Sequence, residues 1–137
     1  MTTPGPVIYL LDDDPSFLAA TARFLQAAGY ATEAFSSPTE FLKIMPSVGD
    51  GCLILDLQMP GLNGFDVQDA VAKQANPLPI IFLTGYGDVQ DAVRAMRQGA
   101  EDFLGKHEAS EDLLRAIKRA LARNARERAQ RQKRTLP

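Results

Sequence analysis

Polar side chains that could handle a phosphate group and a metal ion follow four short apolar runs of the sequence. They are Asp12, Asp13 and Asp14 after the first run, Asp56 after the second, Thr84 after the third and Lys106 after the fourth. Carboxylates packed together repel one another, and a hard divalent cation such as Mg²⁺ relieves that repulsion. One carboxylate could then attack a phosphorus centre, while the ammonium and the hydroxyl contact the phosphoryl oxygens. A zinc site is not expected, because the chain has one histidine and one cysteine.

The elements that must bring these side chains together are five alternating strands and helices. The predicted strands are Val7–Leu11, Ala31–Phe35, Cys52–Leu55, Pro79–Leu83 and Asp102–Leu104, each followed by a stretch with helical periodicity. Three runs are continuously apolar, which is typical of parallel strands covered on both faces, whereas Ala31–Phe35 alternates like an edge strand. This pattern predicts an α/β fold, a flavodoxin-like (βα)5 doubly wound parallel sheet with strand order 2-1-3-4-5. Ligands bind at the carboxyl ends of such strands, where all the polar residues above should meet.

Composition predicts one soluble globular domain with a separate basic tail. The 137 residues are 45% apolar and 23% charged, and no apolar run approaches the length of a membrane span. Residues 1–6 read as a short flexible lead without a signal peptide, and we expect a cytoplasmic protein. Residues 1–114 hold six Lys/Arg and sixteen Asp/Glu, a balance of −10, whereas residues 115–137 hold nine and one, a balance of +8. We therefore expect a globular body over residues 7–121 and a basic helical linker over residues 122–137.

The order and spacing of these motifs resemble those of response-regulator receiver domains over about residues 7–121. The segments that carry the resemblance are LLDDDP at residues 10–15, LDLQMPGLNG at 55–64, FLTG at 82–85 and DFLGK at 102–106. The segments TGYGDV at 84–89 and AVRAM at 92–96 look like the FixJ/NarL-type branch of transcriptional regulators.

The resemblance implies a role for each matching residue. Asp56 would be the phosphoacceptor, and Asp12 and Asp13 would bind Mg²⁺, or Mn²⁺ in its place, together with Asp56 and the backbone carbonyl of Gln58. Thr84 and Lys106 would contact the phosphoryl group, with Phe103 as the aromatic switch residue. Gln58 and Tyr86, two residues after Asp56 and Thr84, would tune the lifetime of the aspartyl phosphate.

The same resemblance implies partners. A sensor histidine kinase would supply the phosphoryl group, and a homodimer would form through the face of the fourth helix, fifth strand and fifth helix. DNA would be contacted only through an output domain, which 137 residues do not contain, and no membrane contact is implied. The protein would accept a phosphoryl group from a kinase or a small phosphodonor and lose it slowly, without turnover as an enzyme.

Two positions depart from the family pattern. His107 follows Lys106 where the family usually has proline, so the cis or trans state of this peptide and the reach of the lysine stay open. Gly85 replaces the usual small side chain after the threonine, which should loosen that loop.

Other interpretations of these residues stay open. Asp12 and Asp13 could cap a helix, as we expect for Asp14, and Phe103 could be a static core residue. The chain could be a standalone single-domain receiver, and the tail a solvated helix without a role. A metal-dependent phosphohydrolase is less favoured because Gln58 stands where such enzymes need a second aspartate. A flavodoxin-like cofactor site is less favoured because the three acids after the first strand would repel a phosphate.

Overall fold

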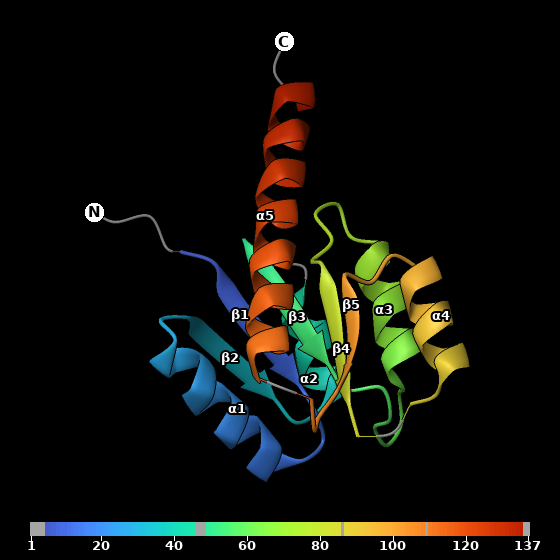
Figure 1. Cartoon of the computed structure of the whole chain (residues 1–137). Helices are drawn as coiled ribbons and strands as arrows, with labels where there is room; N and C mark the ends of the chain where they lie inside the picture. Colours follow the sequence, from blue (N-terminus) through green and yellow to red (C-terminus); the bar gives the residue numbers. More distant parts are fainter. Residues whose placement is uncertain (1–4, 46–48, 86, 109, 136–137) are drawn as a thin grey trace.

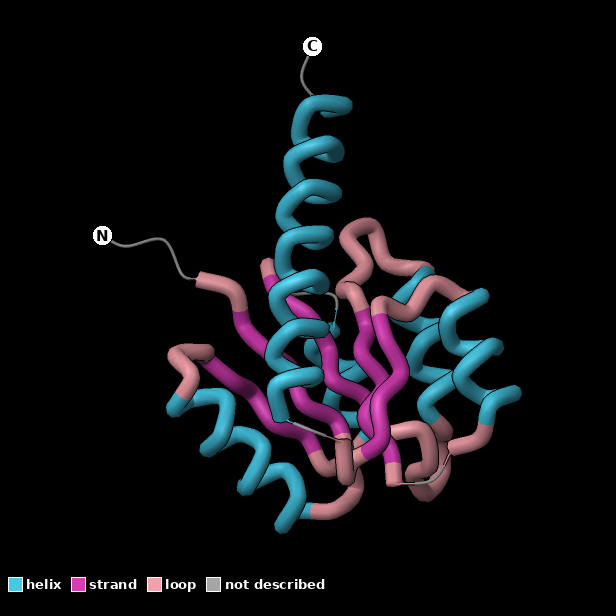
Figure 2. The backbone as a smooth tube through the Cα atoms, in the orientation of Figure 1, coloured by secondary structure: helices cyan, strands magenta, loops and turns pink. Residues whose placement is uncertain are grey.

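The computed structural model describes residues 5–45, 49–85, 87–108 and 110–135. Five strands and five helices alternate along the chain (Figures 1 and 2). The strands are β1 (Val7–Leu11), β2 (Ala31–Phe35), β3 (Gly51–Leu55), β4 (Ile80–Thr84) and β5 (Asp102–Gly105). The helices are α1 (Pro15–Ala27), α2 (Pro38–Ile44), α3 (Gly64–Ala72), α4 (Val89–Arg97) and α5 (Ser110–Thr135).

The sheet has the predicted topology. Its strands are all parallel and lie in the order β2-β1-β3-β4-β5, which confirms the predicted α/β flavodoxin-like fold. Every residue of β3 and β4 is buried, whereas only two residues of β2 are even partly buried. The continuous apolar runs therefore form the centre of the sheet, and the alternating run forms one edge, as expected.

Helices cover both faces of the sheet, so that side chains of the same strand enter two separate cores. On one face, Leu10 and Ile54 pack with α1 and α5 through Leu18 and Ile117. On the other, strand residues such as Leu53 and Phe82 pack with α2, α3 and α4; the helix residues of this core include Phe41, Val67, Val71 and Ala95. Figure 1 shows α1 and α5 in front of the sheet and α2 behind it.

The last helix runs on without a break into the basic part of the sequence. Its 26 residues carry it past the end of the sheet (Figure 1), where Arg131 still donates a hydrogen bond to the Asn76 side chain at 3.4 Å. Contacts with the body continue beyond residue 121, because Asn124 is 2% exposed and its Oδ1 accepts a hydrogen bond from the backbone N–H of Gly51 at 3.1 Å. The predicted boundary at residue 121 thus coincides with no break in the helix, and the division into body and linker stays a prediction.

Two further expectations concern the ends of the chain. Residues 1–4 of the predicted lead lie outside the described residues. Among the helices of the described ranges, none combines the length and the apolar character that crossing a membrane would need.

Candidate functional site

The predicted polar residues meet at the carboxyl edge of the sheet. Asp12 follows β1, Asp56 follows β3, Thr84 ends β4 and Lys106 follows β5, and β1, β3, β4 and β5 are consecutive neighbours in the sheet. A cavity of about 520 Å³ opens at this edge; it is lined by Asp13, Asp14, Asp56, Gln58, Gly85 and Lys106.

Three carboxylates are close enough to share a metal ion. One oxygen from each of Asp12, Asp13 and Asp56 lies within 4.8 Å of the other two. Asp12 and Asp56 are buried while Asp13 is exposed to solvent, so an ion could enter from the Asp13 side. Oxygen ligands of this type suit Mg²⁺. Gln58, whose carbonyl is a predicted further ligand, is exposed and lines the same cavity.

Asp14 has a different role from its two neighbours. It is the N-cap of α1, and its carboxylate accepts hydrogen bonds from the backbone N–H groups of Ser16 and Phe17. The N–H of Asp14 in turn donates to Oδ1 of Asp12 at 2.9 Å. The capping role expected for Asp14 is confirmed, and the same turn fixes the orientation of Asp12.

Lys106 reaches both buried carboxylates. Its Nζ lies 2.7 Å from Oδ2 of Asp12 and 3.9 Å from Oδ2 of Asp56. Burial alone would lower the pKa of Lys106, but the hydrogen bond to Asp12 and the charges of Asp12 and Asp56 outweigh it, so the pKa is raised. The ammonium therefore stays charged beside the predicted phosphoacceptor. No peptide bond among the described residues is cis, so the chain passes from Lys106 to His107 through a trans bond.

Asp56 occupies surroundings that oppose its ionisation. Burial first, and the Asp12 charge second, raise its pKa to about 6, although Lys106 and hydrogen bonds from the Thr84 side chain and the Leu57 backbone lower it. A carboxylate held in this way gains strongly from an added cation. Its backbone is tightly enclosed, because a Cβ at Gly64 would come within 2.7 Å of the Asp56 carbonyl oxygen, so the start of α3 can approach this closely only at a glycine.

Phe103 lies beside the site in a partly buried position. Its ring packs on that of Phe82 with centroids 5.8 Å apart. A Cβ at Gly87 would lie 2.8 Å from the Phe103 ring and 3.1 Å from Cγ2 of Thr84. Phe103 and Thr84 therefore both adjoin the loop after β4. Tyr86, the other residue predicted to affect the aspartyl phosphate, lies outside the described residues.

One contact of the site was not expected from the sequence. Lys106 Nζ lies 4.3 Å from the centroid of the Phe17 ring, on the first turn of α1. The sequence marks Phe17 only as part of the apolar face of a helix. No motif or spacing in the sequence indicates that this ring approaches the lysine.

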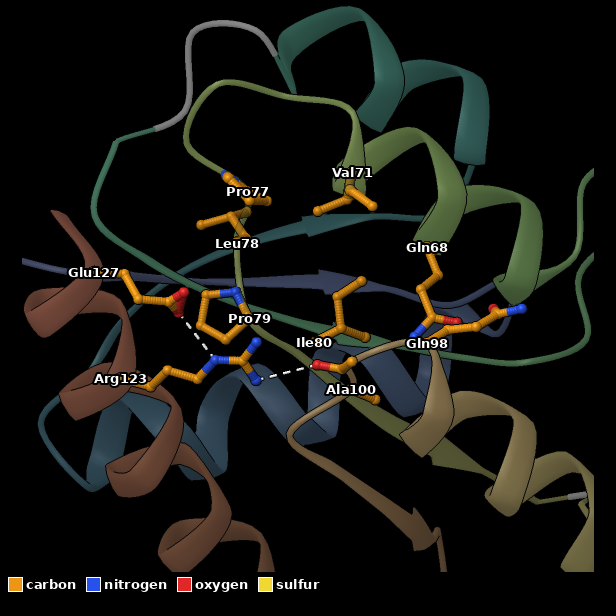
Figure 3. A pocket seen from close by; sticks show the side chains of 12 residues that line it. Gln68, Val71, Pro77, Leu78, Pro79, Ile80, Gln98, Ala100, Arg123 and Glu127 are labelled. Atoms are coloured by element: carbon orange, nitrogen blue, oxygen red, sulfur yellow. Dashed lines mark hydrogen bonds and ion pairs between the residues drawn. The ribbon is translucent and has the colours of Figure 1, made fainter. Parts of the chain in front are cut away.

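A second hollow lies at the opposite edge of the sheet, before the starts of β4 and β5. Figure 3 shows its walls, where Arg123 reaches from α5 toward Glu127 and a backbone carbonyl. Arg123 donates to Oε1 of Glu127 at 2.9 Å and to the carbonyl of Gly99 at 3.1 Å. This hollow of about 140 Å³ contains no cluster of carboxylates among its lining residues, so it offers no comparable chemistry.

Comparisons with known proteins agree with this geometry. The family model described as "Response regulator receiver domain" matches residues 8–118. The chain is 43% identical over 121 residues to the response regulator protein TmoT of Ectopseudomonas mendocina, covering 88% of this chain and 55% of that protein. It is 41% identical over 106 residues to the transcriptional regulatory protein FixJ of Bradyrhizobium diazoefficiens, covering 77% and 51%.

Solved structures give the same result. The response regulator StyR superposes with a TM-score of 0.88 at 35% identity, covering 96% of this chain and 66% of that one. The structure titled FixJ-N superposes with a TM-score of 0.81 at 32% identity, covering 88% and 96%. The chain spans about half the length of the curated relatives it matches. The predicted resemblance, with its FixJ-like character, is confirmed, and the chain belongs to the family of response regulator receiver domains.

Proposed function

We propose that this receiver accepts a phosphoryl group on Asp56, with Mg²⁺, and converts that event into a change of its α4-β5-α5 face. The observation that carries the proposal is the placement of a buried Asp56 carboxylate within reach of two further carboxylates and the Lys106 ammonium at one sheet edge. An ordinary exposed carboxylate does not have two further carboxylates and an ammonium group this close to it. The domain division that goes with this proposal is a receiver over residues 7–121 and a basic linker over residues 122–137.

The transfer step forms one bond and breaks one. An oxygen of Asp56 attacks the phosphorus of a phosphohistidine on a sensor kinase, or of a small phosphodonor. The new O–P bond forms as the bond from phosphorus to the donor breaks, and the donor leaves with the electron pair of that bond and takes up a proton. Lys106, 3.9 Å from Asp56, then stabilises the charge on the phosphoryl oxygens, and the Thr84 hydroxyl donates a hydrogen bond to one of them.

The donor set fits a magnesium ion. Asp12, Asp13, Asp56 and the backbone carbonyl of Gln58 would hold it, all through oxygen, with Mn²⁺ as an alternative ion. Bound there, the ion would neutralise charge on the phosphoryl group during transfer. Gln58 also lines the approach to Asp56, so its side chain would affect how quickly water hydrolyses the aspartyl phosphate. We propose the same effect for Tyr86.

The route from Asp56 to the surface passes through Thr84 and Phe103. A hydroxyl that moves toward the phosphoryl oxygens pulls the loop after β4, which Phe103 contacts at Gly87. The Phe103 ring then moves with that loop, and the face beside it is remodelled. This face carries Val89, Val93 and Met96 of α4, whose side chains are 79%, 42% and 46% exposed. They would form the contact for a second copy of the receiver.

The regulated output is proposed to be transcription. The relatives FixJ and TtrR are named as a transcriptional regulatory protein and a tetrathionate response regulatory protein, and the chain matches only about half of each. An output domain joined beyond the basic linker would contact DNA. A receiver that works alone through protein contacts is the alternative, and the complete open reading frame distinguishes the two.

Phosphorylation with a small donor tests the proposal. The protein is incubated with acetyl phosphate or phosphoramidate and Mg²⁺, and its intact mass is measured. We expect the wild type to gain one phosphoryl group and Asp56→Ala to gain none. Asp69→Asn, which removes an exposed acid from α3, is the matched control and should be phosphorylated like the wild type. A mass gain that persists in Asp56→Ala would overturn the assignment.

A further inference from the structure

The Lys106 ammonium has an aromatic partner as well as two acidic ones. Besides Asp12 at 2.7 Å and Asp56 at 3.9 Å, its Nζ lies over the ring of Phe17, 4.3 Å from the centroid. Phe17 belongs to the first turn of α1, and its backbone N–H is tied to the capping residue Asp14. The ring is therefore anchored by the same turn that orients Asp12.

The two acidic contacts of Lys106 are made only by the ammonium group at the end of its side chain. A lysine side chain has four rotatable carbons and loses considerable freedom when it is held in one place. His107, which follows it, is exposed. Gly85 lies close to the lysine stem, because an added Cβ there would be in van der Waals contact with Cδ of Lys106 at 3.8 Å. The glycine at position 85 leaves that contact with the lysine stem unmade.

We propose that Phe17 is a positioning residue that holds the Lys106 ammonium in place for phosphoryl transfer to Asp56. The inference rests on the proposed function, since it assumes that the lysine contacts the transferring group. The face of a phenylalanine ring carries partial negative charge and attracts a cation within about 6 Å, more strongly where water is excluded. The Lys106 side chain is only 22% exposed, so this attraction is weakly screened.

The surroundings of Phe17 offer a control for the packing effect of a substitution there. Phe17 borders a cavity of about 220 Å³ between α1 and the start of α5. Phe24 lines the same cavity from the same helix and packs on the same core, but the ring over Lys106 is that of Phe17. Phe24 therefore provides a matched control for lost aromatic volume.

The experiment compares phosphorylation rates with phosphoramidate and Mg²⁺ in wild type, Phe17→Leu, Phe17→Tyr and Phe24→Leu. Leucine keeps the apolar bulk but has no ring face. We expect the rate constant to fall between about twofold and tenfold in Phe17→Leu and to stay near wild type in the other two. Equal losses in Phe17→Leu and Phe24→Leu, or no loss in Phe17→Leu, would overturn the inference.

A double-mutant cycle separates positioning from a general structural effect. In a Lys106→Met background, Phe17→Leu should cause no further loss of rate, because the cation that the ring holds is gone. A loss of the same size in both backgrounds would mean that Phe17 acts independently of the lysine and would overturn the inference.

A third measurement does not depend on phosphoryl transfer. The Cε protons of Lys106 should show an upfield ring-current shift by NMR that disappears in Phe17→Leu and persists in Phe17→Tyr. If the wild type takes up no phosphoryl group at all, the proposed function fails, and the NMR signal still decides whether the ring holds the lysine. An unshifted Lys106 signal in the wild type would refute the contact itself.

Discussion

At the scale of single residues, the ionised Asp56 carboxylate is destabilising in the metal-free protein. Burial and the Asp12 charge raise its pKa from 3.8 to about 6, so the folded state binds the proton more tightly than the unfolded chain does. The free energy of unfolding therefore falls as pH rises between about 4 and 6 and stays lower above that range. The rise in the Asp56 pKa corresponds to a loss of about 3 kcal/mol in the free energy of unfolding above pH 6.

Asp56→Asn should remove this cost. In EDTA at pH 7.5, we expect the variant to be more stable than the wild type by about 2–3 kcal/mol in urea unfolding. The difference should shrink as pH falls through 6 toward 4 and approach zero below about pH 3, where the wild-type carboxyl is protonated in both states. Asp69→Asn, an exposed acid, should show no such pH-dependent gain. Equal stabilities of Asp56→Asn and wild type at pH 7.5 would contradict the prediction.

Metal addition should have the opposite consequence for the wild type. With Mg²⁺ at about ten times its dissociation constant, we expect a gain of about 1.4 kcal/mol over the EDTA sample. Asp13→Asn, which removes the exposed member of the carboxylate cluster, should weaken or abolish that gain. Thermal unfolding of both proteins is measured during titration with Mg²⁺ in Ca²⁺-free buffer. If Mg²⁺ stabilises Asp13→Asn as much as the wild type, Asp13 is not a ligand.

At the scale of elements, α5 is anchored by polar groups beyond its last large apolar residue. The Asn124 amide is buried and accepts from the N–H at the start of β3. Asn124→Ala would leave that N–H without its partner, and we expect a loss of about 1–3 kcal/mol in urea unfolding. Arg126→Ala, at an exposed position two residues further along the helix, serves as the control. Equal stabilities of the two variants would show that the bond contributes nothing.

The residues at the strand ends could be predicted from the sequence, whereas Asn124 could not. Asp12, Asp56, Thr84 and Lys106 could be found because each follows an apolar run and a parallel sheet gathers such ends at one edge. Asn124 could not, because a polar residue in a basic segment has no periodic signal of burial. The sequence places the end of the body at residue 121, where apolar spacing stops, although polar contacts continue along the helix.

Phe17 was missed for a related reason. Its helical spacing correctly indicates an apolar face, but spacing says nothing about which end of a helix approaches a charged group. That information depends on how α1 crosses the sheet edge, which only the assembled fold fixes. The strand order, by contrast, follows from the number of apolar residues in each run and was predicted in full.

At the scale of the whole molecule, the exposed apolar residues of α4 predict assembly. Phosphorylated wild type should sediment as a dimer and the unphosphorylated protein as a monomer. A charge at Val93, in Val93→Glu, should keep the phosphorylated protein monomeric while leaving phosphoryl uptake intact. Ala20→Glu places the same charge on an exposed position of α1 and should not impair dimerisation. A phosphorylated Val93→Glu that still dimerises would move the interface elsewhere.

Because α5 is one unbroken helix, its length fixes the orientation of any segment that follows it. A helix turns by about 100° for each residue, and 26 residues span about 39 Å. The direction in which a segment joined beyond Thr135 leaves the receiver is thus set by the number of residues in α5. One residue inserted after Glu127 would swing such an attachment to another side of the receiver, while seven would return it almost to its starting bearing, about 10 Å further out.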